Sequence, residues 1–138
     1  LYGDSFLPID FKAVYAAYQN GGVLAMMTVL KNQNQWDKSN VIFKAEQHID
    51  YNKAQPTQAM NYIDYGLLVM ASTIFKTIPE NKFLDLADIL QQLSSENELK
   101  GYKIYERFYE IGSFQGLKET EEFFTKRMND ELRTATFE

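Results

Sequence analysis

Two acidic residues are the first candidates for metal chemistry in this sequence. Asp4 follows Gly3 at what is predicted to be the end of a strand over residues 1–3, and Glu110 follows a predicted strand over residues 102–108. Carboxylates that converge from two strand ends of one sheet could hold Mg²⁺, which prefers oxygen ligands and keeps several waters. Taken alone, Asp4 is better explained as a turn residue, and Glu110 fits an exposed loop position equally well.

Polar residues on two further segments could contact a phosphorylated sugar. Lys53 lies beside Asn52 just after a predicted strand, where its ammonium could meet a phosphate as a point charge, although its spacing alone favours a solvated lysine. Asp64 and Gly66 interrupt an apolar run, where polar groups must be paired or face a cavity. A sugar-binding wall would explain these two residues, and so would a satisfied core aspartate with a β-bulge at Gly66.

The elements that must position these residues alternate between strands and helices. Strands are predicted by continuous or alternating apolar runs at residues 23–30, 41–46, 49–51, 62–70 and 102–108. Helices are predicted from the cap Asp10 to about residue 20, at residues 71–77 with a stop near Pro79, at residues 85–93, and from residue 116 to about 132, before a frayed end over residues 133–138. In the last helix, Glu119, Glu121 and Glu122 are expected in the first turn, facing the positive end of the helix dipole. This alternation indicates an α/β fold with a largely parallel sheet.

Composition excludes several classes of protein. The 138 residues suffice for one domain with a core, and the net charge of -5 without a basic block argues against a nucleic-acid partner. The absence of cysteine excludes a disulfide framework and fits a reducing cytoplasm. No apolar run approaches the roughly 20 residues of a membrane helix. His48 is the only histidine, so the sequence holds no Cys/His zinc cluster, and it shows no Walker loop or nucleophile elbow.

Taken in order, these segments resemble the sugar-1-phosphate nucleotidyltransferase family over nearly the whole chain. Residues 1–4 resemble its Gly-Asp metal motif, residues 41–53 its hairpin ending in a lysine, and residues 63–66 its sugar-pocket strand. Residues 83–93 resemble its Phe-x-Asp-Leu segment, and residues 109–113 its Asp-x-Gly-Thr motif, followed by Gly116-Leu117. The branch acting on heptose 1-phosphate or N-acetylmuramate 1-phosphate is the most similar, because that branch has Tyr-Glu-Ile-Gly, as residues 109–112 do here, in place of the Asp-x-Gly form. Two departures are Asn52-Lys53-Ala54 in place of Glu-Lys-Pro and Glu110 in place of aspartate.

The resemblance implies a fold and a place for this chain within it. It implies an α/β, Rossmann-like, GT-A-like three-layer fold with a mixed sheet, of which residues 1–138 would be the C-terminal, sugar-binding portion of a single domain. The nucleotide-binding half with its Gly-rich loop is absent from this sequence, so the chain alone is expected to be inactive. A start at Leu1, at the exit of a predicted strand, also favours a preceding segment.

The resemblance also implies a reaction and roles for the candidate residues. A nucleoside triphosphate and a sugar 1-phosphate would give a nucleotide-diphosphate sugar and pyrophosphate. Asp4 and Glu110 would hold Mg²⁺, Lys53 would face the sugar phosphate, and Gly3, Asn52, Asp64 and Gly66 would line the substrate. The resemblance does not identify the nucleotide or the sugar, and it leaves a homo-oligomer possible. We expect a cytoplasmic enzyme without membrane or nucleic-acid partners.

Two alternatives from other classes remain open at the level of the sequence. A glycosyltransferase with a related fold would share a metal site at a strand end, but it would usually show Asp-x-Asp, and position 6 is Phe6. A non-catalytic domain that binds or senses nucleotide sugars would need no turnover. A preceding segment with Gly-rich and basic residues would favour the nucleotidyltransferase.

Overall fold

The chain divides into two compact units, which we describe separately. The sheet unit consists of Leu1 and Ile9–Arg107, and the helical unit consists of Tyr2–Pro8 and Phe108–Glu138. The computed structural model describes residues 1–78, 80–81 and 83–135. The predicted stop at Pro79 and the predicted fraying of residues 136–138 lie outside the described residues.

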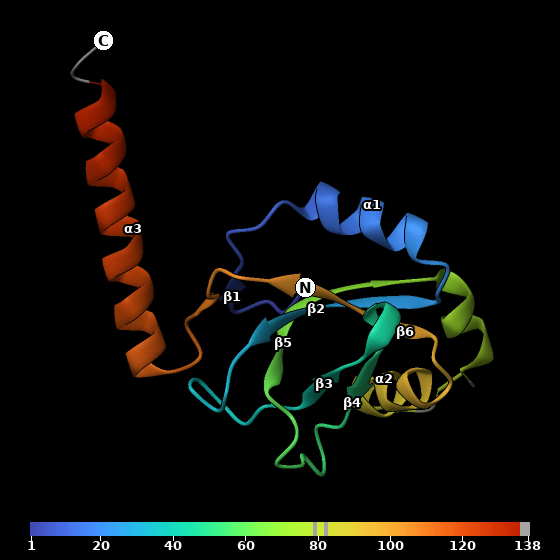
Figure 1. Cartoon of the computed structure of the whole chain (residues 1–138). Helices are drawn as coiled ribbons and strands as arrows, with labels where there is room; N and C mark the ends of the chain where they lie inside the picture. The colour runs from blue at the N-terminus through green and yellow to red at the C-terminus, as the bar shows by residue number, and fades with distance from the viewer. Residues whose placement is uncertain (79, 82, 136–138) are drawn as a thin grey trace. The chain divides into compact units, whose positions relative to one another are not determined.

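A five-stranded mixed sheet forms the centre of the sheet unit (Figure 1). Its strands, in the spatial order β4-β3-β5-β2-β6, are Ile49–Tyr51, Val41–Phe43, Tyr62–Met70, Ala25–Lys31 and Leu99–Ile104. Strand β6 runs parallel to β2, whereas the pairs β2–β5, β3–β5 and β3–β4 are antiparallel. The predicted largely parallel sheet is therefore wrong. Residues 41–70 return through antiparallel neighbours, and antiparallel pairs do not need the helical crossover that parallel pairs require.

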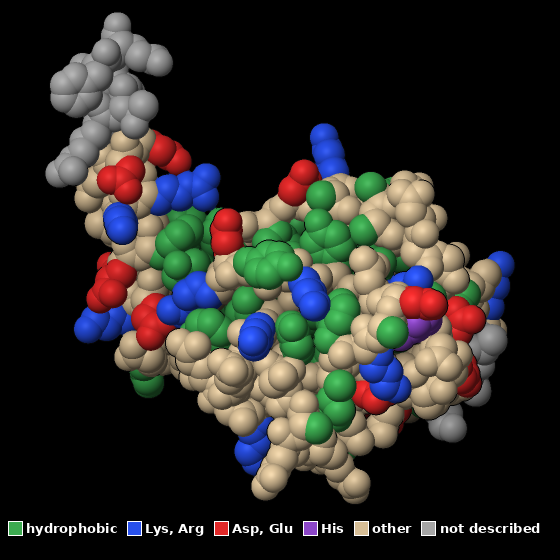
Figure 2. All heavy atoms as spheres, viewed as in Figure 1, with side chains coloured by type: hydrophobic (Ala, Val, Ile, Leu, Met, Phe, Trp, Pro, Cys, Tyr) green, Lys and Arg blue, Asp and Glu red, His purple; other side chains and the backbone are tan. Residues whose placement is uncertain are grey.

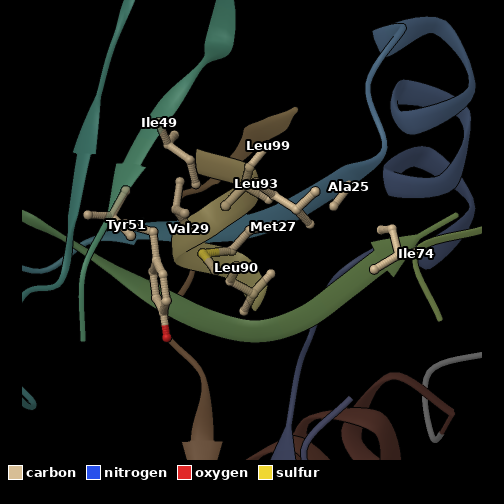
Figure 3. Packing of buried hydrophobic residues seen from close by; sticks show 10 residues of the cluster. Ala25, Met27, Val29, Ile49, Tyr51, Ile74, Leu90, Leu93 and Leu99 are labelled. Carbon is tan, nitrogen blue, oxygen red and sulfur yellow. The ribbon is translucent and has the colours of Figure 1, made fainter. Parts of the chain in front are cut away.

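Helices cover both faces of this sheet and so form three layers. Figure 1 shows α1 (Phe11–Gly21) on one side of the strands and α2 (Leu86–Ser95) on the other. Residues 25–30 of β2 are all buried, which is expected for a strand covered on both faces, because successive side chains point to opposite sides. The main core of the unit, part of which is seen in Figure 3, consists of Ala25, Met27, Val29, Val41, Ile49, Tyr51, Ile74, Leu90, Leu93 and Leu99.

Local signals in the sequence explain where the two helices begin. The Asp10 carboxylate accepts hydrogen bonds from the N–H groups of Lys12 and Ala13, at 2.8 and 3.3 Å, and so caps α1. The Asp85 carboxylate caps α2 in the same way through the N–H of Ala87 at 2.9 Å. Helix α1 ends at Gly22, whose φ of 63° is the left-handed conformation that glycine adopts without strain.

Several predicted boundaries differ from the structure. The predicted strand 41–46 ends at Phe43 and is followed by the 3₁₀ helix Ala45–Gln47, and the predicted helix 71–77 is the 3₁₀ helix Ser72–Thr77. The predicted strand 102–108 is wrong at both ends, because β6 spans Leu99–Ile104. Residues 99–104 pair one to one with residues 25–30 of β2, and this pairing sets the length of β6.

Gly101 is required where the β3–β4 hairpin closes over β6. A Cβ at this position would lie 2.7 Å from Ile49 Cγ2 and 2.8 Å from Phe43 Cε2. We therefore expect Gly101→Ala to lower the free energy of unfolding by about 1–3 kcal/mol through overpacking. Urea unfolding followed by circular dichroism measures this change. Gly3→Ala, where an added Cβ meets nothing within 4 Å, is the control and should be near neutral; equal stability of both variants would contradict the expectation.

The helical unit joins the two ends of the sequence through a short ladder. Strand β1 (Ser5–Phe6) pairs antiparallel with β7 (Tyr109–Glu110), and α3 (Phe114–Ala135) follows. An aromatic cluster packs the ladder against α3: Phe6 lies 4.8 Å from Phe124, and Tyr109 lies 4.1 Å from Phe123, between ring centroids. The predicted strand at residues 1–3 is wrong, because the strand begins at Ser5.

The helix α3 starts earlier and runs further than predicted. It begins at Phe114 rather than Gly116, and it continues through residues 133–135, which were expected to be frayed. Its first turn contains no acidic residue, so the predicted placement of Glu119, Glu121 and Glu122 in the first turn is wrong. Among the residues that the structure describes, no helix combines the length and apolar composition needed to cross a bilayer. On the face shown in Figure 2, Lys and Arg side chains are spread among acidic and hydrophobic ones.

Candidate functional site

The structure brings Asp4 and Glu110 together in the helical unit. Ser5 pairs with Glu110 in the β1–β7 ladder, and the next ladder hydrogen bond runs from the N–H of Ile111 to the carbonyl of Asp4 at 3.0 Å. Asp4 Oδ2 and Glu110 Oε2 each lie 3.1 Å from the point where a Cβ of Gly112 would stand. Asp4 Oδ2 and Glu110 Oε2 are therefore at most twice 3.1 Å apart. Because Gly112 has no side chain, the position beside both oxygens is open.

Both residues reach this position by a route that the sequence pattern did not indicate. Asp4 was expected after the end of a strand, but it precedes β1 in a turn. Glu110 was expected beyond the strand 102–108, but that strand ends at Ile104 and Glu110 belongs to β7. The two carboxylates meet because β1 and β7 pair with each other, rather than because two long parallel strands end at one edge.

The carboxylate of Glu110 is held by the start of α3. Its Oε2 accepts hydrogen bonds from the N–H groups of Gly112 and Ser113, at 2.5 and 3.2 Å, and its Oε1 accepts one from the Ser113 hydroxyl at 2.7 Å. These donors stand at the helix N-terminus, where free N–H groups and the helix dipole favour a negative charge. Asp4 is more exposed, and its Oδ1 accepts a hydrogen bond from the Ser5 hydroxyl at 3.1 Å.

Two close contacts fix the backbone of Glu110 relative to α3. The Thr120 hydroxyl, which is buried, lies 3.1 Å from the Glu110 carbonyl and 2.8 Å from the Gly116 carbonyl. Gly116 approaches β7 so closely that a Cβ there would overlap the Glu110 carboxylate and lie 2.5 Å from the Glu110 carbonyl oxygen. The glycine is therefore required by the position of Glu110.

The donor set of this pair fits a magnesium ion. Carboxylate oxygens are hard ligands, and Mg²⁺ is commonly held by one or two carboxylates, with water and substrate phosphates completing its shell. Within the described part of the chain, no group of three or more His, Cys, Asp or Glu side chains is arranged to hold a metal. A site of only two carboxylates suits an ion shared with a phosphorylated substrate better than a structural ion.

Gly3 lies beside Asp4 in the helical unit, and the remaining predicted site residues belong to the sheet unit, where Asn40 links two of their segments. The N–H of Asn52 donates to the carbonyl of Asn40 at 3.0 Å, and the N–H of Asp64 donates to Asn40 Oδ1 at 3.1 Å. Asn40 is buried, so its polar groups must be paired within the protein. The segments that carry Asn52 and Asp64 thus lie against one residue, while Lys53 follows with an exposed side chain.

Asp64 and Gly66 sit at an irregularity of β5. The pairing register with β2 shifts between Met27 and Val29, and Gly66 has a φ of 104°, which favours glycine. Asp64 Oδ1 accepts the N–H of Gly66 at 2.9 Å. The Thr28 hydroxyl fills the gap by pairing with the N–H and the carbonyl of Leu67. The predicted irregularity at Gly66 is therefore confirmed, whereas Asp64 is half-buried rather than a core residue, and a role in binding sugar stays a prediction.

Tyr51 lies in the core of the sheet unit, and the charges of two acidic residues act on its hydroxyl. Burial of Tyr51, together with the nearby charges of Asp64 and Asp85, raises the pKa of Tyr51 from 10.0 to about 12. Tyr51 is otherwise a core residue, with only 3% of its surface exposed, and its N–H donates to the buried Ser94 hydroxyl at 3.0 Å. Burial first, and the acidic charges second, keep the pKa of this hydroxyl raised, so it stays protonated above pH 10.

This shift predicts a dependence of stability on pH. Because the folded protein keeps the Tyr51 proton to higher pH than the unfolded chain, the contribution of Tyr51 is fully present below pH 10 and is lost as pH rises from 10 through about 12. The loss should be roughly 2–3 kcal/mol. Urea unfolding between pH 9 and 12 should therefore show a shallower decline for Tyr51→Phe than for the unchanged protein. Tyr15→Phe, which removes a tyrosine on the exposed side of α1, is the control; a parallel decline in all three proteins would contradict the shift.

Three residues of these sites were not found from the sequence. Ser113 could have been found as a helix cap, because a serine before an apolar residue is a start signal, but the glycine at 116 was taken as the start instead. Asn40 gave no signal, since its hydrogen bonds with Asn52 and Asp64 do not show in the sequence, and the burial of Tyr51 gave none either. A buried asparagine in a polar stretch looks like an ordinary loop residue.

Comparison with known proteins supports the fold but not a family assignment by sequence. No protein-family model and no curated protein sequence matches the chain. A crystal structure described as a glucose-1-phosphate thymidylyltransferase from Bacillus anthracis, in complex with sucrose, matches with a TM-score of 0.67 and 16% sequence identity. The match covers 88% of this chain and 51% of that chain, so this chain spans about half the length of the solved protein. At this identity the likeness concerns the fold alone, and it confirms the predicted mixed α/β, Rossmann-like fold class.

Proposed function

We propose that this chain forms the sugar-phosphate and metal side of a sugar-1-phosphate nucleotidyltransferase. The observation that carries the proposal is the convergence of the Asp4 and Glu110 carboxylates beside Gly112. The fold supports it, because the matched structure is described as an enzyme of that kind and extends to about twice the length of the match. The nucleotide-binding half of the site would come from a region that this chain does not contain.

The reaction is a displacement at phosphorus. An oxygen of the sugar 1-phosphate attacks the α-phosphorus of a nucleoside triphosphate, the bond from that phosphorus to the bridging oxygen breaks, and pyrophosphate leaves. No protein nucleophile is needed, so catalysis depends on positioning the substrates and neutralising their charge. Bound Mg²⁺ would supply charge neutralisation at the phosphates. The absence of cysteine fits the reducing cytoplasm that the proposal assumes.

Each candidate residue has one role in this proposal. Asp4 and Glu110 would hold the magnesium ion, and Gly3 would let the substrate approach the turn beside Asp4. Lys53, beside Asn52, would offer its exposed ammonium to the sugar phosphate. Asp64, with the backbone at Gly66, would contact sugar hydroxyls.

Pyrophosphate release tests the proposal directly. The 138-residue chain alone should release none from any nucleoside triphosphate with any sugar 1-phosphate, because the α-phosphorus has no fixed position. A protein that joins this chain to its nucleotide-binding half should release pyrophosphate only when triphosphate, sugar 1-phosphate and Mg²⁺ are all present. Sugar transfer from a finished nucleotide sugar to an acceptor would instead indicate a glycosyltransferase. Binding of nucleotide sugar without any turnover would indicate a binding or regulatory domain.

Lys53→Ala should chiefly weaken the use of the sugar 1-phosphate in the joined protein. We expect KM for this substrate to rise about tenfold, with a smaller change in kcat, because the variant removes one charge partner of the substrate and leaves the metal ligands in place. Steady-state kinetics with the triphosphate at saturation measures both constants. Lys38→Ala removes another exposed lysine of the sheet unit and should change neither. If both variants change KM equally, Lys53 acts only through the surface charge of the protein and does not contact the sugar phosphate.

A further inference from the structure

The Ser113 side chain connects the candidate metal ligand Glu110 to the first turn of α3. Its Oγ accepts the N–H of Gly116 at 2.9 Å, which is the usual bond of a helix N-cap, and donates to Glu110 Oε1 at 2.7 Å. A hydroxyl has one proton, and the Gly116 N–H occupies an acceptor position of Oγ, so that proton is directed to the carboxylate. The N–H of Ser113 also reaches Oε2, at 3.2 Å, so this residue contacts both oxygens of Glu110.

These contacts determine which way the carboxylate faces. With Oε1 tied to the Ser113 hydroxyl, the other oxygen, Oε2, is the one that shares the space beside Gly112 with Asp4. Oε2 also accepts the backbone N–H groups of Gly112 and Ser113, at 2.5 and 3.2 Å, so the hydroxyl bond to Oε1 is what stops the carboxylate from turning about that anchored oxygen. A hydrogen bond to an ionised group is about twice as strong as a neutral one, and it can hold a single orientation.

We propose that Ser113 is a positioning residue, whose hydroxyl holds the Glu110 carboxylate in the orientation in which it shares a divalent cation with Asp4. The inference rests on the proposed metal site and adds a residue that acts through Glu110 without touching the cation. Partners of this kind, which orient a metal ligand, commonly change metal affinity by about 10- to 100-fold when they are removed.

The test is a titration of the 138-residue chain with Mn²⁺, which replaces Mg²⁺ and is detected by electron paramagnetic resonance. Ser113→Ala should weaken Mn²⁺ binding by at least about tenfold. Ser113→Thr should restore binding to within about twofold, because threonine keeps the hydroxyl and is also a preferred N-cap residue. Weak binding by the threonine variant, or unchanged binding by the alanine variant, would overturn the proposal.

A matched variant separates positioning from simple loss of helix stability. Gln115→Gly lies two residues further on, at an exposed position, and its side chain pairs with Glu119 rather than Glu110. It should cost α3 about 1 kcal/mol, similar to the loss of a cap, yet leave Mn²⁺ affinity near that of the unchanged chain. If Gln115→Gly weakens binding as much as Ser113→Ala, Ser113 acts only through helix stability and the proposal is overturned.

Variants of the ligands distinguish failure of this inference from failure of the proposed function. Asp4→Asn and Glu110→Gln should each abolish most Mn²⁺ binding. If both leave the Mn²⁺ affinity unchanged, the assignment of Asp4 and Glu110 as metal ligands is wrong, and so is the proposed role of Ser113. If both abolish binding while Ser113→Ala binds normally, the metal site stands and only the role of Ser113 is wrong.

Discussion

Asp4→Asn should lower kcat/KM by about a hundredfold to a thousandfold in a protein that joins this chain to its nucleotide-binding half. The substitution keeps the size of the side chain and removes its negative charge, so packing changes little while the divalent ion loses a ligand. Loss of charge neutralisation at the reacting phosphates should remove several kcal/mol of transition-state stabilisation. Pyrophosphate release measured across a magnesium titration gives the effect, and circular dichroism checks that the fold is retained.

The control for this prediction is Asp10→Asn, which removes a negative charge from the same end of the sequence. Asp10 caps α1, and asparagine caps a helix about as well as aspartate does, so this variant should keep both its fold and its activity. If Asp4→Asn keeps a rate near that of the unchanged protein at every magnesium concentration, Asp4 is an ordinary turn residue and not a metal ligand. A similar loss in both variants would indicate an effect of net charge rather than of a metal ligand.

Gly116→Ala should destabilise the helical unit and remove most of its Mn²⁺ affinity. In an exposed helix, this change normally stabilises by up to about 1 kcal/mol, because alanine is the better helix former. Here the sign should reverse, since the added Cβ would lie 2.5 Å from the Glu110 carbonyl oxygen and would overlap its carboxylate. The side chain could rotate away, but the carbonyl belongs to the β1–β7 ladder and can move only if β7 moves. We expect a loss of about 1–3 kcal/mol.

Urea unfolding and Mn²⁺ titration of the same samples measure the two consequences of Gly116→Ala. The control is Gln115→Ala, the neighbouring exposed helix position, where alanine should leave stability unchanged or slightly higher and Mn²⁺ affinity unchanged. A Gly116→Ala variant as stable as the unchanged chain, with full Mn²⁺ affinity, would show that the approach of α3 to β7 is not required to hold Glu110.

The sequence by itself determined the elements whose signals are local. Asp10 was recognisable as a cap residue because a helix start needs side-chain acceptors within a few residues, whereas Asp85, expected as the first residue of its helix, is the cap of α2. The bounds of β4 and β5 were predicted correctly: polar residues His48 and Asn52 flank β4, and Asn61 precedes the largely apolar β5. The α/β class follows from these elements, the mixed sheet was implied only by the family resemblance, and the match to a solved structure confirms the mixed α/β class.

Only the tertiary structure decided how those elements pair and what the candidate site is made of. Strands β1 and β7 have two residues each, too few for any periodicity, and each exists only because the other end of the chain pairs with it. The same ladder brings Asp4 to Glu110. The roles of Ser113 and Gly116 depend on which groups approach them, and a hydroxyl or a missing Cβ looks the same in a sequence whatever lies beside it. Contacts between residues far apart in the chain carry the chemistry proposed here, and local patterns cannot encode them.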